Sequence, residues 1–269
     1  MKFYTLAITL VFSFACYSQN QKVDIGEFEF ELEYEISGSG KYIVLLEAGM
    51  TRDLNDWEPV FDDIAKITKV IRYSRVGNGN SSKIKQHFSA EDYASHANKL
   101  LEVLNINKPV IYLSHSYGGL ISRAFAANYP DQVNALLFLD PSSEHDLDIM
   151  REIDLKKATE EIEKMMKAGS VHGLPNSYLD YWSKRPMPDF SDIGDIPVTV
   201  IATIKKWDKP PILLMTDQGR KKMGEWHKSW AEQFPRGRAI LTSNSYHFIQ
   251  NSEPELVIQE LKTLIARLN

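Results

Sequence analysis

The fold of this chain is decided by one stretch near its middle, VIYLSHSYGGL at residues 110–120. The stretch begins as a short and almost continuous apolar run, which suits a strand buried on both faces of a sheet. Gly118 and Gly119 then lead into residues 120–128, which suit a helix. A buried strand that enters a helix in this way forms a sharp turn, with the side chain of Ser116 at its tip.

This turn has the pattern of a nucleophile elbow, small-x-Ser-x-Gly. Backbones approach each other closely two residues on either side of the tip, and the small residues Ser114 and Gly118 meet that demand. Ser116 would stand at the N-terminus of the helix, where free N–H groups favour a developing negative charge. We therefore predict that Ser116 is a nucleophile. A solvent-facing serine in an ordinary strand-to-helix turn is the alternative.

Further apolar runs of similar length flank this stretch on both sides. They cover residues 42–46, 70–73, 135–139, 198–202 and 239–241. Segments with helical spacing separate them, and residues 93–104 and 256–265 carry clear apolar stripes. This alternation predicts an α/β fold with a doubly wound, mostly parallel sheet. Residues 26–36 alternate strictly between apolar residues or tyrosine and glutamate, which predicts an antiparallel strand with one solvated face.

One connection is much longer than a crossover between parallel strands requires, at about 55 residues from 141 to 195. Residues 148–168 within it are charged and helical in pattern. Large aromatic residues follow, at Tyr178, Tyr181, Trp182 and Phe190. Side chains of this size need burial, which argues against a disordered insertion. We predict a helical cap, at about residues 141–195, inserted into a single domain of residues 19–269.

Composition excludes several classes of protein. The 269 residues are 43% hydrophobic and 25% charged, which are ordinary globular values and exclude disordered and collagen-like chains. A net charge of −5 argues against nucleic-acid binding, which usually needs a basic surface. The one cysteine, Cys16, can form neither an internal disulfide nor a zinc cluster. No ligand spacing such as His-Glu-x-x-His occurs, so we expect no metal and no cofactor.

The first eighteen residues predict an export signal. Lys2 precedes an uncharged run over residues 3–15, which is too short for a membrane-spanning helix of about 20 residues. The small residues Cys16 and Ser18 then favour cleavage before Gln19. Lipid attachment at Cys16 and an uncleaved anchor are the alternatives. We expect an exported protein, periplasmic or secreted, with no transmembrane segment in its mature chain.

Taken together, residues 25–269 resemble the α/β-hydrolase family, in particular its small, single-domain, esterase-like members with a cap. The resemblance implies a catalytic triad in the chain order serine, acid, histidine. His247 lies after the last predicted strand, and Glu253-Pro254 then opens the terminal helix, as in the family's histidine loop. The resemblance thus identifies Ser116 as the nucleophile and His247 as the base.

The acid of the triad has two candidates. Asp140 follows the apolar run at residues 135–139, a place that some family members use. Most members place the acid after the next strand, in a Gly-x-x-Asp motif. Here that region lacks the glycine, and Asp208 comes late and beside Lys209. We favour Asp140 and keep Asp208 as the alternative, together with a purely structural role for Asp140.

The family builds its oxyanion hole from two backbone N–H groups. The resemblance assigns them to Tyr117, directly after the nucleophile, and to Met50, in LEAGM at residues 46–50, which replaces the family's His-Gly. Residues 74–81, SRVGNGNS, resemble the family's Asp-x-x-Gly-x-Gly-x-Ser turn, with Ser74 in place of the aspartate.

The activity that this resemblance implies is hydrolysis of a carboxylic ester or related acyl bond through an acyl-enzyme. The expected partner is a small acyl substrate. An amidase or peptidase with the same triad is one alternative. A catalytically silent hydrolase-fold binding protein is another, motivated by the altered positions Ser114 and Ser74 and by the missing acid after residue 202. The sequence does not indicate the substrate or the oligomeric state.

Overall fold

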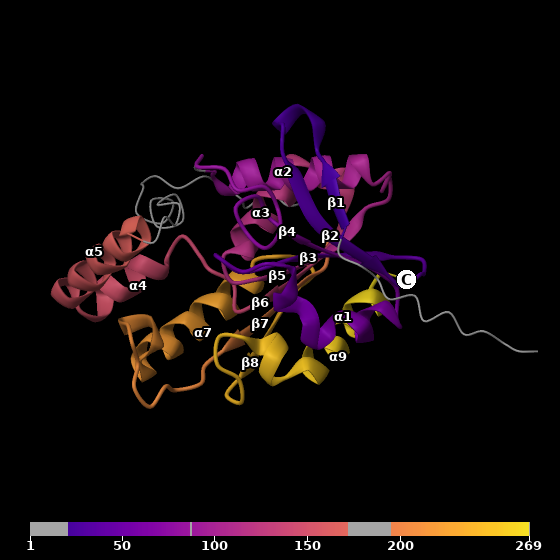
Figure 1. Ribbon diagram of the computed structural model, residues 1–269. Helices are drawn as coiled ribbons and strands as arrows, with labels where there is room; N and C mark the ends of the chain where they lie inside the picture. The colour runs from indigo at the N-terminus through magenta and orange to yellow at the C-terminus, as the bar shows by residue number, and fades with distance from the viewer. Residues whose placement is uncertain (1–20, 87, 172–194, 269) are drawn as a thin grey trace, which may run out of the picture.

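The computed structural model describes residues 21–86, 88–171 and 195–268, and its centre is an eight-stranded sheet (Figure 1). The strand order is β1-β2-β4-β3-β5-β6-β7-β8. The strands are β1 Gln21–Asp24, β2 Glu31–Ser37, β3 Ile43–Glu47, β4 Lys69–Ser74, β5 Val110–His115, β6 Val133–Leu139, β7 Val198–Thr203 and β8 Gly237–Thr242. The first two strands pair antiparallel, and all pairings from β4 to β8 are parallel. The prediction of a doubly wound, mostly parallel sheet is confirmed.

Helices cover both faces of the sheet (Figure 1). Helices α1 and α9 pack on one face, and α2, α3 and α7 pack on the other. The helices are α1 Glu58–Ala65, α2 Ala90–Val103, α3 Gly118–Asn128, α4 Asp146–Ile153, α5 Leu155–Val171, α7 Asp217–Ala231, α8 Ile249–Ser252 and α9 Pro254–Ala266. Short 3-10 turns are η1 Gly26–Phe28, η2 Leu54–Trp57, η3 Pro130–Gln132 and η4 Leu213–Met215.

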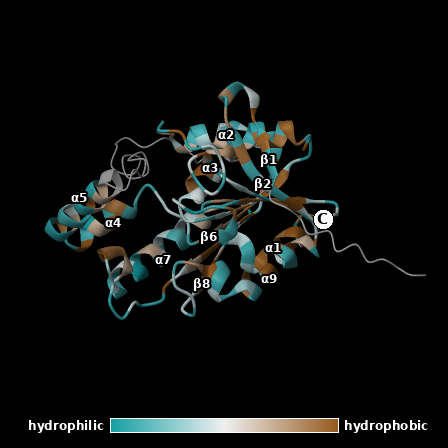
Figure 2. Cartoon of the chain, viewed as in Figure 1, coloured by the Kyte–Doolittle hydropathy of each residue, from teal (hydrophilic) through white to brown (hydrophobic). Residues whose placement is uncertain are grey.

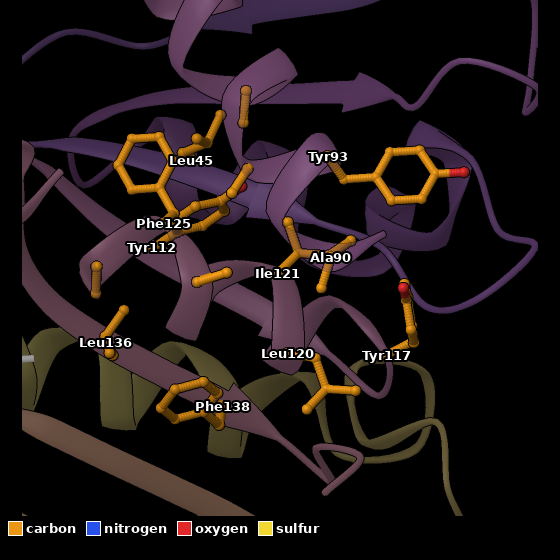
Figure 3. Close-up of a cluster of buried hydrophobic side chains, with 14 of the residues drawn as sticks. Leu45, Ala90, Tyr93, Tyr112, Tyr117, Leu120, Ile121, Phe125, Leu136 and Phe138 are labelled. Atoms are coloured by element: carbon orange, nitrogen blue, oxygen red, sulfur yellow. The ribbon is translucent and has the colours of Figure 1, made fainter. Parts of the chain in front are cut away.

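The sheet separates two clusters of buried apolar side chains. Apolar residues gather in the strands and on the inward faces of the helices (Figure 2). In the larger cluster, Tyr112 and Leu136 of the sheet lie with Ile121 and Phe125 of α3 (Figure 3). Every residue of β5 is buried, which explains why its sequence is almost continuously apolar. Each fully buried Leu, Ile or Phe side chain stabilises the fold by roughly 1.5–3 kcal/mol.

The strand predicted over residues 26–36 differs from the structure in its start and its surroundings. The backbone of Gly26 is left-handed, with φ 60°, and opens the η1 turn, so the strand begins only at Glu31. Glu33 and Glu35 are buried and not solvated, because their side chains pack against those of their cross-strand partners on β4, Ser74 and Arg72. Arg72 of β4 donates to the Glu35 carboxylate at 2.6 Å and so compensates one of these buried charges.

Two predicted segments lie wholly or partly outside the described residues. The signal segment, residues 1–18, does so entirely and stays a prediction. The predicted insertion at about 141–195 contains α4 and α5, whose pairing extends away from the sheet (Figure 1), while residues 172–194 lie outside the description. Helix α4 packs against α7 as well as α5. In the part of the chain that the structure describes, no helix has the length and apolarity to cross a bilayer.

Candidate active site

The predicted nucleophile Ser116 lies in the turn between β5 and α3, with a positive φ of 53°. A non-glycine residue rarely adopts this left-handed backbone, which costs about 1–3 kcal/mol. Besides the bond from the Gly119 N–H to the Ser116 carbonyl within the turn, two backbone hydrogen bonds from outside the turn hold it in place. The Ser116 N–H donates to the Leu139 carbonyl at 3.1 Å, and the Ser116 carbonyl accepts from the Ser142 N–H at 2.9 Å. The end of β6 and the segment after it therefore maintain the strained turn.

The residues around the turn must be small, because other parts of the backbone approach it closely. A Cβ atom on Gly118 would lie 2.7 Å from the carbonyl oxygen of Glu47, so no larger residue fits there without a shift of backbone. Ser114 is fully buried, and its Oγ lies 2.9 Å from the Oγ of Ser122 on α3. The serine that replaces the usual first glycine is thus small and has a hydrogen-bonding partner.

The structure brings the three predicted triad residues together at the carboxyl ends of the parallel strands. His247 Nε2 lies 2.9 Å from Ser116 Oγ, and His247 Nδ1 lies 2.6 Å from Asp140 Oδ2. The three residues follow β5, β6 and β8, whose ends meet at the same edge of the sheet. Since an ionised carboxylate can only accept, Asp140 selects the tautomer with a proton on Nδ1. Nε2 is then free to accept the Ser116 proton.

Asp140 is held from the side opposite to the histidine by a buried arginine. Its Oδ1 accepts from Arg220 Nη2 at 2.7 Å and from the Thr203 N–H at 3.1 Å. Arg220, on α7, also donates to the Thr203 carbonyl. Burial opposes ionisation of Asp140, but the charge of Arg220 and the hydrogen bond to His247 outweigh it, so the pKa of Asp140 lies well below its usual range. The carboxylate is therefore ionised and fixed in orientation.

The alternative acid does not take part in this arrangement. Asp208 is exposed on the segment that follows β7, and the position facing His247 Nδ1 is occupied by Asp140. The geometry therefore favours Asp140 over Asp208.

The surroundings of His247 shift the pKa of its imidazole downward. Burial lowers the pKa of its imidazole, the hydrogen bond to Asp140 opposes that effect, and the nearby His115 and Arg220 lower the pKa further. The net direction is downward, so the neutral form that can accept a proton persists below the usual pKa of about 6.5.

The segment after β3, which contains the predicted oxyanion residue Met50, is held by a buried guanidinium. Arg75 Nη1 donates to the Ala48 carbonyl at 2.7 Å, and Arg75 Nη2 donates to the carbonyls of Gly49 and, at 2.6 Å, Met50. Arg75 also pairs with the buried Glu47 carboxylate at 2.5 Å. Because a trans peptide points its N–H opposite to its C=O, the Met50 N–H is directed away from Arg75. The other predicted donor, Tyr117, is buried at the start of α3 (Figure 3).

Comparison with known proteins identifies the fold that carries this geometry. A family model described as the alpha/beta hydrolase fold matches residues 42–170, which include the elbow and Asp140. The chain has the α/β-hydrolase fold. An uncharacterized protein of Bacillus subtilis, YqjL, is 25% identical over 223 residues, which cover 82% of each chain.

Solved α/β-hydrolase structures share the fold at low sequence identity. A thermophilic esterase from Thermogutta terrifontis has a TM-score of 0.67 and 20% identity, over 93% of this chain and 99% of the esterase. The epoxide hydrolase CorEH has a TM-score of 0.65 and 18% identity, over 93% and 99% of the two chains. Since these two neighbours carry out different reactions, the shared fold does not determine the chemistry of this α/β-hydrolase.

The turn at residues 74–81 of this α/β-hydrolase is held by a carboxylate from another strand. Ser74 stands where the resemblance leads one to expect aspartate, and its Oγ donates to Glu33 Oε2 at 2.8 Å. The same Oε2 accepts from the Asn80 N–H at 2.9 Å. Ser74 Oγ accepts from the Leu54 N–H at 3.1 Å, which connects the turn to η2. Glu33 of β2 therefore supplies the negative charge near a turn that lacks its own aspartate.

Several residues of the site were not predicted from the sequence. Arg220 and His115 contact the triad, and Arg75 contacts the Met50 loop, yet none of them was singled out as a candidate. Arg75 lies inside the turn motif at residues 74–81, which offered a signal for its importance. Arg220 comes from a charged helix of ordinary pattern and offered none. Within the described ranges, no group of three metal-ligating side chains occurs.

Proposed function

We propose that this α/β-hydrolase is a serine hydrolase of carboxylic esters, with Ser116 as nucleophile, His247 as base and Asp140 as acid. One observation supports the proposal above all others. The continuous hydrogen-bonded series from Ser116 Oγ through His247 to Asp140, with separations of 2.9 and 2.6 Å, has the connectivity that nucleophilic catalysis by serine needs.

In the proposed reaction, His247 Nε2 takes the Ser116 proton while Oγ attacks the ester carbonyl. The tetrahedral intermediate collapses to an acyl-enzyme, and His247 returns the proton to the departing alcohol. Water then enters, and His247 accepts one of its protons as the water oxygen attacks the acyl carbon. His247 returns that proton to Ser116 Oγ as the second tetrahedral intermediate collapses, so that the acid product leaves and Ser116 is regenerated. Asp140 holds the imidazole and stabilises its charged form in both halves of the cycle.

The developing oxyanion would be stabilised by the backbone N–H groups of Tyr117 and Met50. Two observations support this assignment. Tyr117 directly precedes α3, so its N–H belongs to the N-terminal end of that helix, where the helix dipole favours negative charge. Arg75 holds the carbonyls of Gly49 and Met50, which fixes the direction of the Met50 N–H.

An ester substrate with an apolar group is favoured by the surroundings of the base. The neighbours of His247 in the chain, Tyr246 and Phe248, are 36% and 37% exposed, and Trp207 lies 4.8 Å from Tyr246 between ring centroids. Such an exposed aromatic rim would contact an acyl or alcohol chain. A serine at the elbow disfavours the epoxide-hydrolase reaction of one structural neighbour, because that chemistry uses an aspartate as nucleophile.

The proposal is tested with purified protein and two matched panels, p-nitrophenyl esters of increasing acyl length and peptide p-nitroanilides. We expect ester turnover that exceeds anilide turnover and that is lost in Ser116→Ala. Ser142→Ala is the matched control, since Ser142 contacts the turn only through its backbone N–H. Faster cleavage of the anilides would identify an amidase. Undiminished ester turnover in Ser116→Ala would refute the role of Ser116.

A further inference from the structure

A second histidine, next to the proposed nucleophile in the chain, is held between two hydrogen-bond acceptors. His115, the last residue of β5, is 1% exposed. Its Nδ1 lies 3.1 Å from Asp56 Oδ2, and its Nε2 lies 3.0 Å from the backbone oxygen of His247. His115 therefore connects β5 and the η2 turn with the loop that carries the proposed base.

Asp56 Oδ2 and the backbone oxygen of His247 can each only accept a hydrogen bond from His115. A backbone carbonyl carries no proton. The other oxygen of Asp56, Oδ1, accepts from Arg52 Nε at 3.0 Å. This pair with the Arg52 guanidinium favours the ionised form of the Asp56 carboxyl, independently of His115. Asp56 is therefore a carboxylate, which can only accept. A neutral imidazole has one N–H, whereas the imidazolium has two. Only a protonated His115 satisfies both contacts.

We propose that His115 is a positioning residue that works as an imidazolium: its charge is paired with Asp56, and its Nε2–H holds the carbonyl of His247 and so fixes the loop of the base. The catalytic consequence of this inference rests on the proposed function, in which His247 is the base. The charged and titratable groups around His115 are Asp56 in η2, Arg52 just before η2, His247 in the segment after β8, and, beyond His247, Asp140 and Arg220.

The position of this cation has a second consequence. The ring centroids of His115 and His247 lie 4.8 Å apart. A positive charge at that distance disfavours protonation of His247 and keeps it available as a base at lower pH. His115 would therefore affect both the placement and the working pH range of the base, through one hydrogen bond and one charge.

The two effects can be separated with a matched pair of substitutions. In His115→Gln, the amide nitrogen can reach the place of Nε2, so it retains a donor to His247 but loses the charge. In His115→Asn, the shorter amide reaches the place of Nδ1 and leaves the His247 carbonyl without its donor. We expect His115→Gln to keep most of kcat while the acid limb of kcat/KM moves to higher pH. We expect His115→Asn to lower kcat by about 100-fold, the cost of a small misplacement of a catalytic group.

Two further variants test the ion pair. Asp56→Asn is nearly isosteric but neutral, and its amide can donate to Nδ1 of a neutral His115 whose Nε2–H still holds the His247 carbonyl. We therefore expect it to keep most of kcat and to move the acid limb to higher pH, as His115→Gln does. His96→Gln is the matched control, because His96 is also buried but packs among the rings of Phe28, Phe30 and Phe88. It should change neither kcat nor the acid limb. A merely structural role for His115 predicts lower stability without movement of that limb.

Nitrogen NMR of the imidazole rings decides the protonation state without any need for turnover. At about pH 7, both ring nitrogens of His115, assigned by comparison with the His115→Gln spectrum, should have shifts typical of protonated nitrogen. A neutral His115, or an unmoved acid limb in His115→Gln, would overturn the inference while the esterase proposal stands. Protein that lacks ester turnover but retains a doubly protonated His115 would instead overturn the proposed function and leave the ion pair in place.

Discussion

The pairing of Asp140 with Arg220 yields a prediction in which activity and stability separate. In Asp140→Asn, the amide cannot hold the imidazole in the tautomer that accepts the serine proton. The corresponding change in other serine triads lowers kcat by about 10⁴-fold, and we expect a loss of that order. Asp208→Asn should leave kcat within about twofold of wild type, since surface substitutions rarely matter.

The same substitution also leaves a buried cation without its anion. Arg220 is 4% exposed, and its Nη2 lies 2.7 Å from Asp140 Oδ1. Removal of one partner from a buried ion pair costs about 3–5 kcal/mol. Because asparagine keeps an oxygen that can accept from Arg220 and from the Thr203 N–H, we expect the lower end, about 3 kcal/mol of unfolding free energy. That is a large share of the roughly 5–15 kcal/mol typical of a domain.

The stability loss should depend on pH with a definite sign. The pKa of Asp140 is depressed in the folded state. Its stabilising contribution is therefore present above the unfolded pKa of about 3.9 and is lost as the pH falls toward the folded value. The difference between wild type and Asp140→Asn should be greatest at neutral pH and should shrink below about pH 4.

Urea unfolding followed by tryptophan fluorescence, alongside ester kinetics, measures both effects. The double variant Asp140→Asn/Arg220→Met removes the stranded charge but also the donor to the Thr203 carbonyl, so it should regain part of the lost stability and none of the lost activity. The reasoning would be refuted if the double variant were as unstable as the single one, or if Asp208→Asn abolished turnover while Asp140→Asn did not.

The remaining predictions concern the base, the oxyanion loop and the turn that precedes α2. Because burial lowers the pKa of His247, kcat/KM should fall on the acid side only below about pH 6.5. A fall in kcat/KM that begins above that pH would contradict a lowered pKa for His247. Arg75→Lys keeps a charge for Glu47 but cannot hold the carbonyls of residues 48–50 together. It should lower kcat by up to about 100-fold with a smaller change in KM, and equal effects on both would count against oxyanion positioning. Glu33→Gln should lower the melting temperature, at a cost of about 1–3 kcal/mol, while kcat per folded molecule stays unchanged; lost kcat at full folding would contradict a structural role for Glu33.

The parts of the fold that were predictable are those with strong local patterns. The buried parallel strands are almost continuously apolar, and the turn at Ser116 needs small residues at fixed places, so both could be located in the sequence. The proximity of Ser116, Asp140 and His247 follows once these residues are placed after parallel strands, because such strand ends share one edge of the sheet.

The parts that were not predictable depend on contacts between distant elements. Strict alternation over residues 26–36 indicated solvated glutamates, but the pairing of β2 with β4 buries Glu33 and Glu35 against partners elsewhere in the chain. Arg220 reaches Asp140 because α7 packs against β7, and the spacing of apolar residues in the sequence does not indicate this packing. His115 on β5 contacts both η2 and the segment that contains His247, and the sequence around His115 does not indicate these contacts.

The central claim, that His247 activates Ser116 as a nucleophile, is tested most directly by labelling with a fluorophosphonate, which reacts with activated serines. Intact protein should gain one label, and peptide mass spectrometry should locate it on Ser116. Ser116→Ala should take up no label, and His247→Ala should take it up far more slowly. A wild-type protein that stays unlabelled, or that is labelled equally well without the imidazole, would contradict the account.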